Sequence, residues 1–150
     1  PLGFILGDEG SGAVLGKLLV GDILKNQLSP AIKEVFLKQF DLTVPEIIDR
    51  VYRQPFPNRF LASLSPFIAQ HLEEPGIRQL VLGSFIAFLR RNVMQYDYTQ
   101  YPAHFIGSVA HCYKEILQEA AQETGIRIGK ILQSPMEGLI QYHSDPLHQP

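Results

Sequence analysis

The sequence predicts an α/β fold that carries a large, mainly helical insertion. After residue 96 the apolar pattern alternates strand, helix, strand, helix, which is typical of an α/β layer. Between residues 11 and 96, apolar residues instead recur at helical spacing, and capping signals separate the segments. With 150 residues, 45% of them apolar, the chain has the size of one domain and enough apolar material to form a core.

The chain opens with an apolar run that leads into an acidic loop, Gly-Asp-Glu-Gly-Ser at residues 7–11. Residues 4–6 fit a buried strand that ends at this loop. An acid pair on a loop bounded by glycines offers acceptors for neutral donors such as sugar hydroxyls, and the glycines allow a ligand to approach the backbone. The alternative is that Asp8 or Ser11 only N-caps the following helix. The loop is therefore a candidate binding site, with capping as the other interpretation.

Neither common phosphate-loop pattern fits these glycines. A Walker loop fails because Ser11 and Leu18 stand where the pattern requires a glycine and a hydroxyl residue. The dinucleotide pattern fails because Gly16 comes one position late, and the two acids of the loop would repel a pyrophosphate.

Three helices are predicted between residues 11 and 52 from their caps and apolar stripes. The first covers residues 11–26, with a core stripe of Val14, Leu15, Leu18, Leu19, Ile23 and Leu24. Ser29 N-caps the second, with Pro30 in its first turn. The third begins with a capping box formed by Thr43 and Glu46, and residues 53–57 end it.

Two further helices complete the helical part. Asn58 is predicted to cap a helix over residues 59–73, and Pro75-Gly76 separates it from a fifth helix over residues 77–96. The apolar stripe at residues 80–89 is either core or a homodimer face. It is much shorter than the roughly 20 residues that a membrane span requires.

The second half of the chain contains another candidate site. A polar connection over residues 97–102 leads to a strand near residues 105–109. Tyr96, just before this connection, and Tyr98 and Tyr101 within it either border a cleft or pack on the insertion. A helix then ends at Gly125, a strand follows at residues 126–132, and residues 134–137 form a second capping box. Gly107 and Ser108 lie where the first strand meets the helix, and ligands of open α/β sheets bind at such strand ends. A plain tight turn is the alternative.

Composition excludes several classes of function. The 13 basic and 15 acidic residues lack the excess of positive charge typical of nucleic-acid binding. We predict no membrane span and no secretory signal. We also predict no metal site, because the five histidines and Cys112 lack the spacing of metal ligands. A single cysteine forms no internal disulfide and favours a cytoplasmic location.

The chain begins with Pro1, close to the candidate site and without an initiator methionine. This suggests that it is the later part of a longer protein.

The two candidate sites together resemble a known family. The pentapeptide at residues 7–11, a helical insertion containing Arg59-Phe60, and Ile106-Gly107-Ser108-Val109 after a strand resemble the second lobe of N-acetylglucosamine kinase and its bacterial relatives. These proteins belong to the hexokinase and actin-like ATPase superfamily. The resemblance implies a ribonuclease-H-like, C-terminal lobe over residues 1–150, in which residues 11–96 are the insertion and residues 103–143 carry the adenosine motif. The N-terminal lobe would precede this chain.

The resemblance also implies an activity and roles for individual residues. ATP with Mg²⁺ would phosphorylate a sugar, such as N-acetylglucosamine, between two closing lobes. Asp8 would bind sugar hydroxyls, with Ser11 and Gly12 at the acetamido side. Gly107 and Ser108 would line the adenosine pocket, with Ala62 against the adenine. The general base is expected upstream of Pro1.

The sequence departs from the family in one respect, and two alternatives stay open. The family's tryptophan after the pentapeptide is missing, since the chain contains no tryptophan. An activator-type ATPase of the same superfamily would hold an iron–sulfur cluster with cysteines, of which this chain has only Cys112. In a non-enzymatic interaction module, the helices over residues 29–96 would instead form a partner surface.

Overall fold

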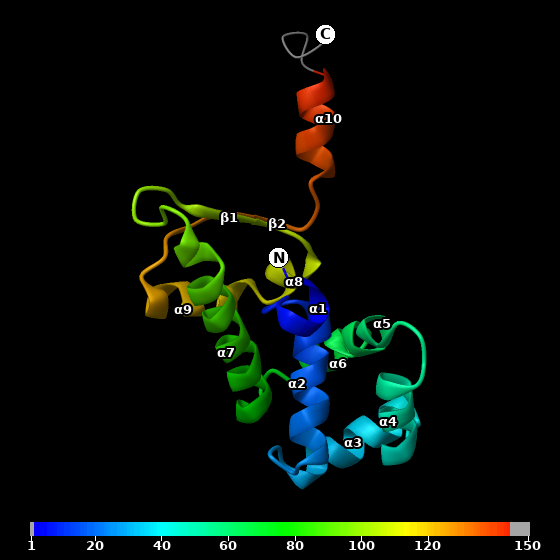
Figure 1. The fold of residues 1–150 in the computed structure, drawn as a ribbon. Helices are drawn as coiled ribbons and strands as arrows, with labels where there is room; N and C mark the ends of the chain where they lie inside the picture. Colours follow the sequence, from blue (N-terminus) through cyan, green and yellow to red (C-terminus); the bar gives the residue numbers. More distant parts are fainter. Residues whose placement is uncertain (1, 145–150) are drawn as a thin grey trace.

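The structure, a computed structural model, describes residues 2–144, in which a body of helices adjoins a two-stranded parallel sheet (Figure 1). The helical part comprises α1 (Gly3–Leu6), α2 (Gly12–Leu24), α3 (Pro30–Phe40), α4 (Val44–Tyr52), α5 (Pro57–Ala62), α6 (Ser65–Gln70), α7 (Pro75–Arg91) and the 3₁₀ turn η1 (Val93–Gln95). The sheet part comprises β1 (Ala103–Ile106), α8 (Ser108–Cys112), α9 (Lys114–Thr124), β2 (Ile128–Leu132) and α10 (Met136–Ser144). The α/β prediction is thus confirmed as a mixed, helix-rich fold with a small parallel sheet.

Helix α2 lies at the centre of the helical body and contacts α3, α5, α6 and α7. Its buried stripe includes Leu15, Leu19 and Ile23, each at most 1% exposed, whereas Leu18 is 37% exposed at the edge of the predicted stripe. Helix α2 approaches α5 closely at Gly16, where an added Cβ would lie 2.0 Å from the carbonyl oxygen of Leu61. Only glycine permits this approach.

The predicted caps of α3 and α4 are confirmed. Ser29 Oγ accepts a hydrogen bond from the Ile32 amide at 3.4 Å. Thr43 and Glu46 form the capping box, and the Thr43 amide donates to the Glu46 carboxylate at 2.7 Å. Both caps involve residues three apart, so local sequence is sufficient to specify them.

The single helix predicted over residues 59–73 is wrong: α5 and α6 are two short helices that meet at Ser63 and Leu64. Pro66 has no amide hydrogen to donate to the carbonyl four residues earlier, so a continuous helix would lose a hydrogen bond there. The N-cap of α5 is Phe56 in a left-handed conformation, with φ of 57°, and Asn58 lies inside the helix.

Helix α7 forms much of the core. The burial of its apolar stripe decides between the two predicted roles, core or homodimer face. Val81 and Leu89 are fully buried, and Leu80 and Phe85 are 8% and 3% exposed. These residues therefore belong to the core and not to a dimer face. The helix ends at Arg91, five residues before the predicted end, and η1 follows it.

The sheet is a β-α-β unit in which β1 and β2 pair in parallel, with Ala103 opposite Ile128 and Phe105 opposite Ile131. The helical connection is interrupted at Tyr113, so the one helix predicted there is two, α8 and α9. Tyr113 is 2% exposed, and its hydroxyl donates to the Ser65 carbonyl at 2.9 Å. Gly125 ends α9 as predicted.

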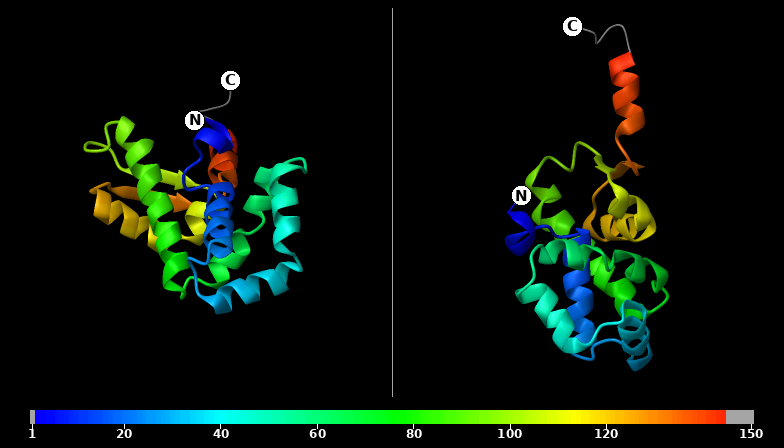
Figure 2. Two further views of the ribbon diagram at one scale, coloured as in Figure 1. Left: turned by 60° about the horizontal axis from the view of Figure 1, so that its bottom comes forward. Right: turned by 90° about the vertical axis from the view of Figure 1, so that its right-hand side faces the viewer.

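The carboxyl-terminal end of the described segment projects from this body. Helix α10 stands away from the other elements in two views and has no buried residue (Figures 1 and 2). Its start is near the predicted one, and Ser134 Oγ accepts from the Met136 amide at 3.2 Å.

The strand predicted over residues 4–6 is wrong, because α1 occupies this segment. Ile5 and Leu6 are 72% and 73% exposed, and the two described strands pair only with each other. An apolar run of three residues cannot distinguish a strand from a helical turn. Among residues 2–144, no helix is both long and apolar enough to cross a bilayer.

Candidate functional site

The two candidate loops lie in one cleft although about a hundred residues separate them in the sequence. It is lined by residues 8–11, by residues 105–110, and by Phe85, Phe88 and Leu117. The cleft has a volume of about 390 Å³. The structure therefore brings together four of the predicted site residues: Asp8, Ser11, Gly107 and Ser108.

Asp8 and Ser11 use their side chains differently. Ser11 Oγ accepts from the Val14 amide at 3.2 Å and is the N-cap of α2. The side chain of Asp8 is exposed and has no hydrogen bond or ion pair within residues 2–144. Its backbone is left-handed, with φ of 66°, and its carbonyl accepts from the Ser11 amide at 2.9 Å. The capping interpretation is thus right for Ser11 and wrong for Asp8, whose carboxylate is available to a ligand.

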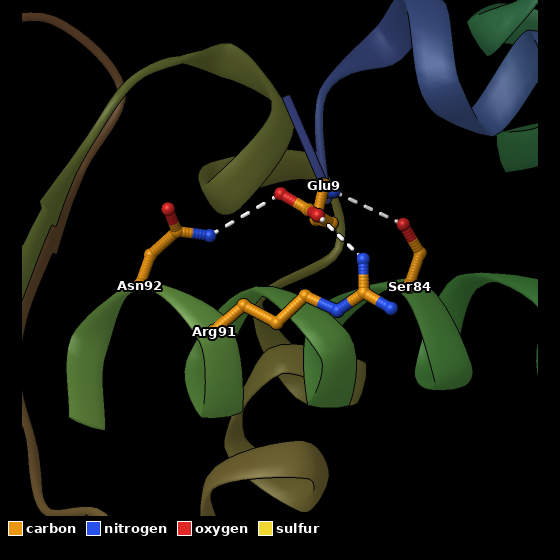
Figure 3. A network of polar contacts seen from close by, with 5 residues as sticks. Glu9, Ser84, Arg91 and Asn92 are labelled. Carbon is orange, nitrogen blue, oxygen red and sulfur yellow. Dashed lines mark hydrogen bonds and ion pairs between the residues drawn. The ribbon is translucent and has the colours of Figure 1, made fainter. Parts of the chain in front are cut away.

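The second acid of the pair is engaged by the protein itself (Figure 3). The Glu9 carboxylate pairs with Arg91 at 3.0 Å and accepts from the Asn92 side-chain amide at 3.3 Å. Hydrogen bonds from its own backbone amide and from Arg91 hold the pKa of Glu9 below its ordinary value. Of the two acids, Asp8 is thus the one whose carboxylate has no hydrogen bond or ion pair among residues 2–144.

Gly10 attaches the same loop to α7. Its amide donates to Ser84 Oγ at 3.0 Å, and a Cβ at this position would lie 3.3 Å from the Phe85 ring. With φ of 77°, the backbone has a conformation that favours glycine. Sequence reasoning missed the partners of this loop on α7. They lie 74 to 83 residues away, where no local pattern pairs them.

Gly107 and Ser108 lie at the carboxyl end of β1. The Gly107 amide donates to the Leu132 carbonyl at 2.9 Å, which continues the pairing with β2, and its φ is 141°. Ser108 is exposed and begins α8. This is the sheet edge at which open α/β folds bind their ligands.

The other two predicted site residues, Gly12 and Ala62, do not line this cleft and lie against each other. An added Cβ at Gly12 would lie 3.6 Å from the Cβ of Ala62 and 2.8 Å from Ser65 Oγ. The Ser65 hydroxyl is buried and has no hydrogen-bond partner among residues 2–144.

A larger cleft lies on the other side of the acidic loop. It has a volume of about 1000 Å³ and is lined by residues 6–9, the end of α7 and the connection into β1, including Tyr96, Tyr98 and Tyr101. The three tyrosines thus border a cleft, one of the two arrangements that the sequence allowed. Asp8 and Glu9 line both clefts, so the loop separates them.

Comparison with solved structures finds a close match. A crystal structure from Porphyromonas gingivalis, of a protein named "Putative N-acetylglucosamine Kinase", shares 57% sequence identity with this chain, with a TM-score of 0.93. The match covers 95% of this chain and 50% of that one, so the chain spans about half the length of its relative. Protein-family models gave no match, and neither did the curated proteins. The resemblance to N-acetylglucosamine kinases predicted from the sequence is confirmed.

Proposed function

We propose, from this resemblance to an N-acetylglucosamine kinase, that the chain is the second lobe of a two-lobed, ATP-dependent sugar kinase with a ribonuclease-H-like core. The observation that carries the proposal is the shared cleft. The segment expected to bind sugar and the segment expected to bind adenosine both line it. In this proposal residues 11–96 are the helical insertion and residues 103–143 are the part that binds the nucleotide.

The exposed apolar surface supports the assignment to one lobe of a larger protein. Among the large apolar side chains that are at least 42% exposed, eight lie on or next to α1, at the ends of the two strands and on α10: Leu2, Ile5, Leu6, Ile106, Leu132, Met136, Leu139 and Ile140. A nine-residue helix that buries none of its own residues is marginal in water by itself. A second lobe, in the half of the relative that this chain does not match, would cover this surface.

Asp8 is assigned to the sugar. An ionised carboxylate accepts charge-assisted hydrogen bonds from two neighbouring hydroxyls, and a sugar that lacks one of them leaves an acceptor unpaired. Ser11, whose oxygen already accepts from Val14, can still donate its hydroxyl hydrogen. We assign Ser11 and the adjacent Gly12 to the acetamido side of the sugar pocket.

The cleft fits the adenosine of ATP. Its aromatic lining, Phe85, Phe88 and Phe105, offers apolar surface to a planar base, and the backbone at Gly107 and Ser108 is open to the cleft. Ala62 lies outside this lining, so its assignment to the adenine rests on the family resemblance alone. No group of three or more His, Cys, Asp or Glu side chains in the described part of the chain is placed to hold a metal ion.

The proposed reaction is in-line phosphoryl transfer. A sugar hydroxyl would give its proton to the general base and attack the terminal phosphorus of ATP in line, as the bond to the leaving ADP breaks; bound Mg²⁺ would supply charge neutralisation. The chain's own residues bind and orient: Asp8 fixes the sugar, and closure of the lobes excludes water so that transfer outcompetes hydrolysis. The general base is expected in the other lobe.

The test is Asp8→Asn in the full-length protein, with Asp22→Asn as a control. Asp22 is a carboxylate on α2 with no side-chain hydrogen bond or ion pair in the described part of the chain. We expect Asp8→Asn to lower the sugar kcat/KM about 100-fold, since each hydrogen bond to a charged group contributes about 1.5–3 kcal/mol. Turnover equal to that of the control would refute the assignment. Sugar-stimulated release of ADP separates a kinase from a plain ATPase, and ATP-binding calorimetry separates both from an interaction module.

A further inference from the structure

Helix α7 holds the acidic loop at two consecutive residues. Ser84 accepts from the Gly10 amide at 3.0 Å, and Arg91 pairs with Glu9 at 3.0 Å (Figure 3). The two α7 residues are seven apart, which places them on the same face of the helix, two turns from each other. Asn92, directly after the helix, adds a hydrogen bond to Glu9 at 3.3 Å.

The position of Glu9 is electrostatically unfavourable without these partners. Its side chain is only 16% exposed and lies at the carboxyl end of α7, where the helix dipole disfavours negative charge. Arg91 and Asn92 offset this effect directly. The contacts with Arg91 and Asn92 therefore hold the Glu9 carboxylate in this position, since a negative charge at the carboxyl end of α7 does not stabilise that helix.

Asp8 has no comparable attachment. Its carboxylate makes no contact with a polar group in the described part of the chain, and its backbone has the left-handed φ of 66°. The direction of the side chain therefore depends on how the backbone is fixed at the next two residues. Both of these are attached to α7.

We propose that Arg91, Asn92 and Ser84 are positioning residues for Asp8. By fixing Glu9 and Gly10, they orient the Asp8 carboxylate toward the sugar. This inference rests on the proposed function, and it assigns a role in sugar recognition to the end of a helix that lies about eighty residues further along the chain.

The test variant is Arg91→Gln in the full-length protein, and the matched control is Arg90→Gln. Both arginines lie in the last turn of α7, so either change removes the same charge from the same helix end, but only Arg91 contacts the loop. Arg91 is 71% exposed, so its replacement leaves little buried space. We expect a loss of about tenfold in sugar kcat/KM for Arg91→Gln, with the KM for ATP equal to that of Arg90→Gln.

A second comparison separates positioning from a merely structural role. If Arg91 acts only through Asp8, the double variant Asp8→Asn/Arg91→Gln should be no less active than Asp8→Asn alone. Losses that multiply in the double variant would overturn the proposal, as would an equal effect of Arg90→Gln. Arg91→Lys keeps the charge and should recover part of the lost activity.

The outcomes also distinguish the two proposals. If Asp8→Asn lowers sugar kcat/KM and Arg91→Gln does not, the positioning role is wrong and the kinase assignment stands. If Asp8→Asn has no effect, the sugar contact itself is wrong, and the positioning role falls with it.

Discussion

The close approach of α2 and α5 gives a sharp prediction for Gly16→Ala. The new Cβ would lie 2.0 Å from the Leu61 carbonyl oxygen and 2.7 Å from its carbon, so one helix must move by more than 1 Å to restore ordinary contact. Overpacking of this kind costs about 1–3 kcal/mol, and here the obstacle is backbone and not a flexible side chain. We expect Gly16→Ala to destabilise the protein by about 3 kcal/mol.

Gly21→Ala is the matched control, because Gly21 lies in the same helix and an added Cβ there meets nothing within 4 Å. Alanine should stabilise this position by up to about 1 kcal/mol through its higher helix propensity. The free energies of unfolding, measured by urea denaturation, should therefore differ by about 4 kcal/mol between the two variants. If Gly16→Ala is as stable as Gly21→Ala, the helices are not in the contact described here.

Three further predictions concern single contacts. The pKa of Glu9 in the folded protein lies below its unfolded value of 4.5, so the unfolded state binds more protons in this range. The ionised carboxylate therefore stabilises the fold above pH 4.5. This stabilisation is lost as the pH falls through the lowered pKa. Urea denaturation at about pH 7 and about pH 3 should thus show a smaller acid-induced loss of stability in Glu9→Gln than in the parent. Tyr113→Phe removes the hydrogen bond to the Ser65 carbonyl and should lower the free energy of unfolding by about 1 kcal/mol. Ser29→Ala removes the cap that accepts from the Ile32 amide and should lower the free energy of unfolding by about 1 kcal/mol in the same assay. For either variant, an unchanged free energy of unfolding would contradict the hydrogen bond that the substitution removes.

The parts of the fold that the sequence predicts well depend on neighbours in the chain. Ser29 and Thr43 bond to groups three residues away, and Gly125 ends α9 through its own left-handed conformation. Such features follow from residue type and spacing alone. The strand-to-helix turn at Gly107 was predicted for the same reason.

The errors arise where the outcome depends on distant packing or on a single breaking residue. Residues 4–6 are apolar but find no strand to pair with in the described part of the chain, so they form an exposed helical turn. The apolar pattern over residues 59–73 hid the effect of Pro66, which divides that segment. The attachments of Glu9 and Gly10 to α7 follow only from the tertiary fold.

The arrangement of α7 also bears on whether the helical insertion is a partner surface or part of the site. One of the two loops that line the cleft is tied to this helix through Ser84 and Arg91. The other is packed against it as well, because Phe88 contacts Phe105 edge to face, with ring centroids 6.2 Å apart. The same helix thus sets the separation of the two loops, and a shift of α7 would move both of them. A surface that served only to bind a partner would not need this helix to contact two loops of a cleft, so the position of α7 supports the proposed site at that cleft.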